Sequence, residues 1–329
     1  MDEVSSVNIR AYLYDASDID EAIELSEFDV DQLDESKLLW VTVLKRDAKL
    51  IEQAAAQLKI EHPPVKLIIE GSSHPALIKF DEFFHFSVNS VMLHSDESPL
   101  KFPVDFLVGK NFVVTIHDDE VDFFADFRKR ERGDSIFGRL SSESFIATLL
   151  DLHIVSYFNA LNAIERQVDK LDSKILKKEL DTDEFIARMV ELRRNVSKLR
   201  RWLIPQRELI YSFVRADFQQ ITEEDTREVY KTLESHFENA VDAIDGSREA
   251  VLGAFDLYAT KSSQLTNVFI QRLTFLTLVM GGLGVVAGIL GMNFKNAFYD
   301  NPYGFWITVS AMVIFTLGAA IYARHRRWI

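Results

Sequence analysis

The stretch that decides the fold is residues 273–294, LTFLTLVMGGLGVVAGILGMNF, which carries no charged side chain over 22 residues. At about 1.5 Å per residue, a helix of this length spans the roughly 30 Å hydrocarbon core of a bilayer. A helix buried in a soluble core rarely runs this long without a polar face. We therefore expect a transmembrane helix over about residues 269–294.

A second uncharged stretch, residues 301–323, follows after a short polar turn. From Phe305 onward it is apolar apart from small and hydroxyl-bearing residues, which predicts a second transmembrane helix over about residues 303–323. The alternative is a hairpin buried in a soluble core, which would need a polar face that neither stretch has. We expect the chain to cross the membrane twice.

The residues that flank the two stretches predict the orientation. The turn between them carries one Lys and one Asp, whereas a basic cluster and Trp328 directly follow the second stretch; the cluster contains Arg324, Arg326 and Arg327. By the positive-inside rule this tail is cytoplasmic, and two crossings then place residues 1 to about 268 in the cytoplasm as well. The acidic opening Met1-Asp2-Glu3 has no apolar segment, so we expect no signal peptide. The predicted location is the cytoplasmic (inner) membrane, with multiple spans and both termini cytoplasmic.

The composition excludes several classes of function. A net charge of -14 and a pI near 5.1 argue against nucleic acid as a partner, because phosphate binding needs a basic surface. The absence of cysteine excludes disulfides and thiolate metal sites. No nucleotide partner is expected, because Gly282, Gly284 and Gly288 lie inside a predicted membrane helix, where a phosphate cradle cannot form. No nucleophile and base stand at motif spacing, so we expect neither an enzyme nor a resident cofactor.

The N-terminal part, residues 1–135, is predicted to be a cytoplasmic α/β domain. Its first 60 residues hold fourteen acidic against six basic side chains, a surface that attracts cations or simply keeps the domain soluble. Branched and aromatic residues predict strands at Val7–Tyr14, Leu38–Leu44, Ala76–Phe80, Phe83–Leu93 and Asn111–His117. Helical spacing with acidic starts predicts helices at Asp18–Phe28 and Asp47–Leu58.

Residues 136–268 are predicted to form a helical stalk. From Ser142, apolar residues recur every three or four positions as far as Ile175, and a second helix is expected from Glu184. A third helix is expected from Ile221, with no obvious stop before Gly291. It would hold about 69 residues and measure roughly 100 Å, which would take it from the cytoplasm through the membrane.

A stripe of small and polar residues runs along the first membrane helix. Two crossings cannot enclose a path for polar solutes, so conduction would require oligomerisation. The stripe residues are spaced three, four, three and four apart and so share one face: Thr274, Thr277, Gly281, Gly284 and Gly288. Such a stripe is typical of a pore lining, and equally of close helix packing through a small-xxx-small pair. The spacing leaves both open.

The chain resembles the CorA-type divalent metal cation transporter family (CorA/ZntB-like), and the resemblance covers nearly its whole length. It is carried by Gly291-Met292-Asn293, the GMN motif, at the end of the first of two C-terminal membrane helices, followed by an aromatic second helix and a basic tail. Residues 108–117, VGKNFVVTIH, look like a strand of the family's soluble domain. Residues 192–194, LRR, and 203–208, LIPQRE, are similar to its stalk helix.

The resemblance implies a funnel-shaped homopentamer whose pore is lined by five copies of the first membrane helix. It implies that Gly291, Met292 and Asn293 form the outer mouth, where Asn293 meets the metal ion through its hydrating water. A ring of neutral oxygens suits Mg²⁺, because this ion dehydrates reluctantly. By ungapped count Asn267 matches a second polar ring; alternatively it is an interfacial Asn without ion contact. The implied partners are a second copy of the chain, membrane lipid and the transported cation.

Several departures from the family leave the gate and the ion open. Leu290 replaces the usual Tyr, and Gly281-Gly282 replace a bulky residue and Pro, so Ile270 and Leu273 become alternative constrictions. The position of the family's regulatory Asp falls near Thr232, which leaves cation sensing without support. Mg²⁺ is the expected ion, with Zn²⁺, Co²⁺ or Ni²⁺ transport of the ZntB-like branch as the alternative. A non-conducting membrane scaffold or cation sensor is the alternative of another class.

Overall fold

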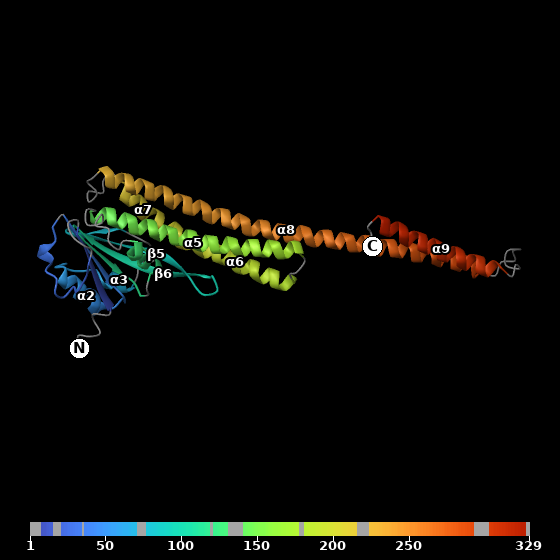
Figure 1. Cartoon of the computed structure of the whole chain (residues 1–329), viewed down its shortest axis with the longest axis horizontal. Helices are drawn as coiled ribbons and strands as arrows, with labels where there is room; N and C mark the ends of the chain where they lie inside the picture. Colours follow the sequence, from blue (N-terminus) through green and yellow to red (C-terminus); the bar gives the residue numbers. More distant parts are fainter. Residues whose placement is uncertain are drawn as a thin grey trace. The chain divides into compact units, whose positions relative to one another are not determined.

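A computed structural model shows the chain as two compact units, which are described separately below (Figure 1). The first unit comprises residues 1–173 and 180–253, and the second comprises residues 174–179 and 254–329. The structure describes residues 8–15, 21–34, 36–70, 77–118, 121–130, 141–177, 181–215, 224–292 and 303–326.

The first unit is built on a seven-stranded sheet with the order β2-β1-β3-β7-β6-β5-β4. Only the β3–β7 pair is parallel among the described strands, and the others are antiparallel. The strands are β1 (Ile9–Asp15), β2 (Glu21–Ile23), β3 (Lys37–Val43), β4 (Ile78–Lys79), β5 (Phe83–Leu93), β6 (Pro99–Gly109) and β7 (Phe112–Ile116).

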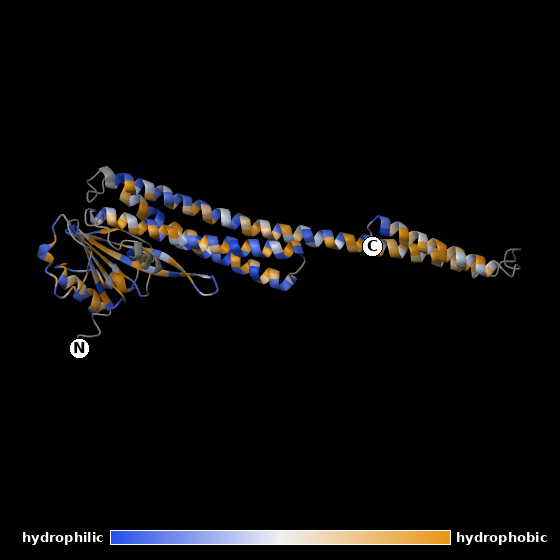
Figure 2. Cartoon of the chain, viewed as in Figure 1, coloured by the Kyte–Doolittle hydropathy of each residue, from blue (hydrophilic) through white to orange (hydrophobic). Residues whose placement is uncertain are grey.

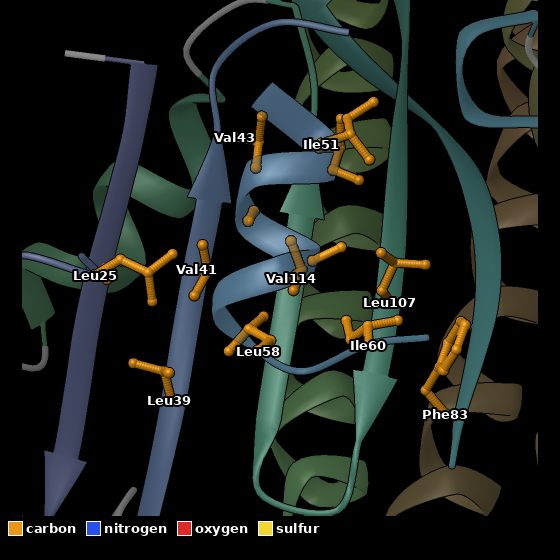
Figure 3. Packing of buried hydrophobic residues seen from close by; sticks show 14 of the residues in the cluster. Leu25, Leu39, Val41, Val43, Ile51, Leu58, Ile60, Phe83, Leu107 and Val114 are labelled. Carbon is orange, nitrogen blue, oxygen red and sulfur yellow. The ribbon is translucent and has the colours of Figure 1, made fainter. Parts of the chain in front are cut away.

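One face of the sheet is covered by α2 (Ala48–Gln57) and α3 (Val65–Glu70) (Figure 3). Asp47 starts α2, because its carboxylate accepts hydrogen bonds from the backbone N–H groups of Lys49 and Leu50. The core residues of this face alternate along each strand, as period-two side chains must. They include Leu39, Val41, Val43, Leu107, Val114 and Ile116 from the sheet and Ile51, Ala54 and Ile68 from the helices.

The opposite face is aromatic and is covered by helices from later in the chain. Phe86 and Phe106 stack with their ring centroids 4.7 Å apart, and Phe213 packs edge-on against Phe86 at 5.2 Å. Trp40 is fully buried against Phe124 and Phe145. These edge-on aromatic contacts stabilise the fold beyond the effect of burying apolar surface area. The sheet therefore lies between two helical layers.

The helices of the aromatic side confirm most of the predicted helical pattern. They are α4 (Asp122–Arg130), α5 (Ser142–Lys177), α6 (Thr182–Leu203), the 3-10 turn η3 (Ile204–Gln206) and α7 (Arg207–Val214), followed by α8 (Glu224–Leu290). Pro205 sits in η3, where its missing N–H costs no helical hydrogen bond. Tyr230 of α8 fixes the start of that helix, because it stacks on Phe213 and donates a hydrogen bond to the Glu143 carbonyl.

The second unit contains the end of α8 and the helix α9 (Gly304–His325). Neither helix carries a charged side chain over residues 273–290 of α8 and 304–323 of α9, and hydrophobic residues dominate these stretches (Figure 2). Three of the described helices are long and apolar enough to cross a membrane, namely α5, α8 and α9. The apolar window of α5 is 56% buried within the chain, whereas those of α8 and α9 are 0% and 6% buried. Packing on the sheet accounts for the apolar face of α5, whereas the apolar stretches of α8 and α9 stay largely exposed in the single chain apart from the groove that they share.

One predicted helix is wrong. In Asp18–Phe28, residues 21–23 form β2, which pairs with β1 through Ala11 and Ile23. Ile23 of β2 packs against the core that α2 covers, and Leu25, in the turn after the strand, is buried in the same core. Residues 18–20 lie outside the described residues. Tertiary packing overrides the local helical spacing here.

The segment 108–117 is a hairpin connection and not a single strand. It contains the end of β6, a turn at Lys110-Asn111 and the whole of β7. A Cβ atom at Gly109, the last residue of β6, would collide with the Phe112 ring, so any other residue there would require that ring to move. The sequence analysis also missed α3, α4 and most of β6, which are short or irregular in pattern. Residues 221–223, where the third helix was expected to begin, lie outside the described residues.

A buried polar network joins β5 to the helices on the aromatic side. Tyr157 and Gln206 both donate hydrogen bonds to the Asn89 carbonyl, and Gln206 also reaches the Tyr157 hydroxyl. His153 lies 2.8 Å from the Ser90 hydroxyl through its Nδ1 atom. Burial lowers the pKa of His153 from its ordinary 6.5 to about 4, because the imidazolium would lose its hydration.

This depressed pKa predicts acid sensitivity of the fold. Below pH 6.5 the unfolded chain protonates His153 while the folded chain does not, so stability falls as the pH drops from 6.5 toward 4. At pH 5 the loss is about 2 kcal/mol for this one group. We expect His153→Asn, whose amide can still meet Ser90, to show a smaller loss of stability between pH 7 and pH 5 than the native chain, as measured by the thermal unfolding midpoint in detergent. The control His94→Asn removes an exposed histidine at the β5–β6 turn and should leave the pH dependence unchanged. An identical pH dependence for native chain and His153→Asn would contradict the assignment.

Candidate functional site

The GMN motif begins where α8 ends. The helix closes at Leu290, and the backbone N–H of Gly291 still donates to the Ala287 carbonyl at 2.9 Å. A Cβ atom at Gly291 would lie 3.3 Å from that carbonyl oxygen, which is tighter than most real contacts. Met292 is half exposed. Asn293, the residue predicted to meet the ion, lies outside the described residues.

The predicted pore-lining residues all lie on one side of α8. At about 100° per residue they occupy an arc of roughly 100° around the helix axis. They are Asn267, Ile270, Thr274, Thr277, Gly281, Gly284 and Gly288, and every one is solvent-exposed in the single chain. Of the two alternative constrictions, Ile270 lies inside this arc and Leu273 at its edge. We call this surface the small-residue face.

The side of α8 that faces α9 is a different one. A groove of about 650 Å³ lies between the two helices, and Gly282, Leu283, Val286, Ile289 and Leu290 line it from α8. Ile307, Thr308, Ala311, Met312 and Phe315 line it from α9. At about 100° per residue, the five groove residues of α8 centre about 150° away from the small-residue face. The partner helix of the same chain therefore leaves the small-residue face open.

The glycines of this face are not explained by packing inside the chain. Cβ atoms built on Gly281, Gly284 and Gly288 meet no atom within 4 Å. Glycine in a helix interior costs roughly 1 kcal/mol relative to alanine, so three of them call for a reason. Close packing against α9 is excluded as that reason for the described residues. A pore lining or contact with another chain remains.

The polar groups of the apolar segment are compatible with a membrane. The Thr277 hydroxyl donates to the Leu273 carbonyl at 2.8 Å, and Thr308 and Thr316 of α9 make the equivalent bond. In hydrocarbon these local bonds remove the cost of an unpaired hydroxyl. The segment 273–292 contains no charged residue.

The basic tail starts within the last turn of α9. Arg324 lies in that turn, and the Arg326 guanidinium lies over the Tyr322 ring, 5.9 Å from its centroid. Basic residues at a helix C-terminus are favoured by the helix dipole. Arg327 lies outside the described residues.

The described residues contain no group of three or more His, Asp or Glu side chains that could hold a metal ion. Around His94, the Asp96 carboxylate accepts from the Ser98 N–H, which makes this segment a polar turn. His117 is buried at the end of β7. Near the expected sensing position, Thr232 donates to the Glu228 carbonyl and Lys231 pairs with Glu228.

The sequence analysis did not identify the α9-facing side of α8. Its signal was present, because Leu283, Val286 and Leu290 are large apolar residues spaced three and four apart. In a helix that is apolar all round, that spacing does not distinguish the side facing α9 from the side facing lipid.

Comparison with known proteins identifies the class. The chain matches the family described as CorA-like Mg²⁺ transporter protein over residues 35–325. It is 24% identical over 322 residues to the cobalt/magnesium transport protein CorA of Thermotoga maritima, covering 94% of this chain and 90% of that protein. The complete structure of the CorA magnesium transporter from Methanocaldococcus jannaschii matches with a TM-score of 0.71 at 19% identity, over 97% of this chain and 98% of that one. The ZntB cytoplasmic domain from Vibrio parahaemolyticus matches with a TM-score of 0.60 at 12% identity, over 78% of this chain and 99% of that domain.

The chain belongs to the CorA-like Mg²⁺ transporter family. It is therefore a membrane protein of a family that transports divalent cations, and it is not an enzyme. The predicted resemblance is confirmed.

Proposed function

We propose that five copies of this chain form a ring in the cytoplasmic membrane and conduct Mg²⁺ through a central pore lined by the small-residue face of α8. The observation that supports the proposal is the position of that face, which points away from the groove shared with α9; Cβ atoms built on its three glycines meet no described atom within 4 Å. In such a ring α8 lies inside and α9 lies outside, toward lipid. Both termini are then cytoplasmic.

The single chain has no way to enclose an ion path. Its two apolar helices leave large side chains such as Leu278 and Ile314 exposed by about 70%, which suits contact with lipid or with other subunits. The small-residue face exposes instead hydroxyl groups and helix backbone. Among the sides of α8 it is the one that a hydrated ion meets at the lowest desolvation cost.

The ion selectivity is proposed to rest on Asn293, with Gly291 and Met292 shaping the backbone that presents it. Five side-chain carbonyl oxygens would accept hydrogen bonds from the water that Mg²⁺ retains. A neutral ring holds the ion weakly enough to release it. For a doubly charged ion, the membrane potential supplies about 4.6 kcal/mol per 100 mV, which is enough to drive uptake without a nucleotide.

The chemistry of the pore residues favours Mg²⁺ over softer ions. Residues 267–292 contain no histidine or cysteine, and the side chains of the small-residue face offer oxygen ligands alone. The relatives from Thermotoga maritima and Methanocaldococcus jannaschii are named as cobalt/magnesium transport proteins. Zinc transport, in the manner of the ZntB-like branch, is the alternative, since the ZntB cytoplasmic domain shares the fold of the first unit.

One prediction of the proposed function concerns Asn293. Asn293→Ala should abolish Mg²⁺ flux into proteoliposomes while leaving the assembly intact, because it removes the oxygens that hold the hydrated ion at the mouth. Asn267→Ala is the matched change at the other end of the same face, and it should reduce flux less. Native flux rates from an intact Asn293→Ala assembly would reject the selectivity ring and favour the scaffold alternative.

The second prediction uses the absence of cysteine, which provides a background free of native thiols. In assembled protein, Thr277→Cys should react with a water-soluble cationic thiol reagent, and the reaction should block flux, because the residue lines the water-filled path. Leu283→Cys, which faces the α9 groove, should stay unreacted. Labelling of Leu283→Cys with protection of Thr277→Cys would show that α8 turns its other side to the pore.

The third prediction concerns assembly and topology. Native mass spectrometry of the purified protein should give five chains of 37.8 kDa each. In sealed vesicles of known orientation, a protease on the cytoplasmic side should cut the basic tail. A stable monomer, or a tail that is cut only from the outside, is incompatible with the proposed architecture.

A further inference from the structure

A groove in the first unit gathers arginines from two helices, and neither the motif nor the apolar segment involves it. The groove holds about 690 Å³ and lies between α6 and α8. Its polar lining consists of Arg193, Arg194, Ser197, Arg200 and Arg201 from α6 and Arg248 from α8. The lining contains five guanidinium groups and no carboxylate.

The pattern of α6 builds this surface. Leu192, Leu199 and Leu203 are buried on one side of the helix and hold it in the unit. The arginines recur after seven residues, as the pairs 193–194 and 200–201, which returns them to the same exposed side after two turns. Val190 and Val196 lie beside them in the groove, where they can cover the aliphatic stems.

These charges are largely unpaired. Arg200 forms an ion pair with Asp245 at 3.3 Å, and both side chains are half exposed. Among the residues that the structure describes, Arg193, Arg194, Arg201 and Arg248 have no carboxylate partner. A chain with a net charge of -14 does not need basic clusters for solubility, and like charges in one groove repel one another. The helix dipole favours Arg200 and Arg201 in the last turn of α6, but this effect does not account for Arg193, Arg194 or Arg248.

We propose that this groove binds a multiply charged phosphate anion of the triphosphate class. Guanidinium groups present a planar fork of donors that matches phosphate oxygens in pairs. The volume of the groove lies in the range of small-ligand sites. Among the described residues, the lining has no aromatic side chain to stack on a base and no carboxylate to bind a ribose. We therefore expect the groove to recognise the phosphate groups and not the nucleoside. This inference does not rest on ion conduction.

The test is titration calorimetry of the full chain in detergent with inorganic triphosphate, in buffer stripped of divalent cations. Saturable binding at one site per chain is expected. Arg194→Gln and Arg201→Gln should each weaken binding at least tenfold, because each removes a charge-assisted pair of hydrogen bonds. Arg201→Lys, which keeps the charge and loses the fork, should give an intermediate affinity. Arg188→Gln is the matched control: it removes an equally exposed arginine of α6 outside the groove and should bind like the native chain.

The source of the phosphate is distinguished in the same experiment. A nucleoside triphosphate should bind within about threefold of inorganic triphosphate, and anionic phospholipid added to the micelles should not displace either. Much tighter binding of the nucleoside triphosphate than of inorganic triphosphate would overturn the assignment of the groove to a phosphate site open to solution. Displacement of either anion by the lipid would overturn it as well.

Other outcomes also contradict the proposal. One is the absence of triphosphate binding. Another is a loss of affinity in Arg188→Gln as large as that in the groove variants, and a third is an affinity of Arg201→Lys equal to that of the native chain. The second and third outcomes would indicate diffuse electrostatic attraction without a built site. If Arg194→Gln changes the number of chains in the assembly and leaves triphosphate affinity unchanged, the groove is a contact between copies of the chain and the proposal fails.

Discussion

Hydrocarbon offers no hydrogen bonds to a peptide backbone, and this constraint shapes the second unit. Only an unbroken helix can satisfy every N–H and C=O group internally, so α8 runs without interruption to Leu290. The threonines of both apolar helices return their hydroxyl bonds to their own backbone for the same reason. Two helices bound by this constraint can form a hairpin, but they cannot surround water. An ion path therefore has to come from several chains, and the surfaces left unpaired within one chain are where they would meet.

Two sides of α8, the side facing α9 and the small-residue face, have different surroundings. Leu283, Val286 and Leu290 are among the residues that face α9, while Cβ atoms built on the glycines of the small-residue face meet no described atom within 4 Å. Because the small-residue face points away from α9, packing within the chain does not explain its spacing. Two functions remain for this face, namely lining a pore and contacting another chain. In a ring the two roles are adjacent, because residues at the edge of an inward-facing stripe also touch the next subunit.

Much of this architecture could be predicted from the sequence, because its signals are long and periodic. The uncharged stretches gave both apolar helices, and the regular apolar spacing gave α5, α6 and most of α8. Shorter elements were less accessible. The strand β2 was mistaken for a helix, because only its pairing with β1 shows that this short segment is extended. The arginine groove could not be predicted as a site, because Arg248 is 47 positions from Arg201 and only folding brings them to one groove. The role of Asn293 comes from resemblance to the family and not from geometry.

The proposed function requires that an assembly of this chain, with no other protein, conducts a divalent cation. The most direct measurement is uptake of Mg²⁺, Zn²⁺, Co²⁺ and Ni²⁺, compared side by side, into liposomes that contain only the purified protein and carry an imposed membrane potential. The proposed function predicts that Mg²⁺ uptake rises as the liposome interior is made more negative, and that uptake stops when the membrane potential is collapsed. No uptake of any of the four ions above that of empty liposomes, from protein shown to be assembled and inserted, would contradict it.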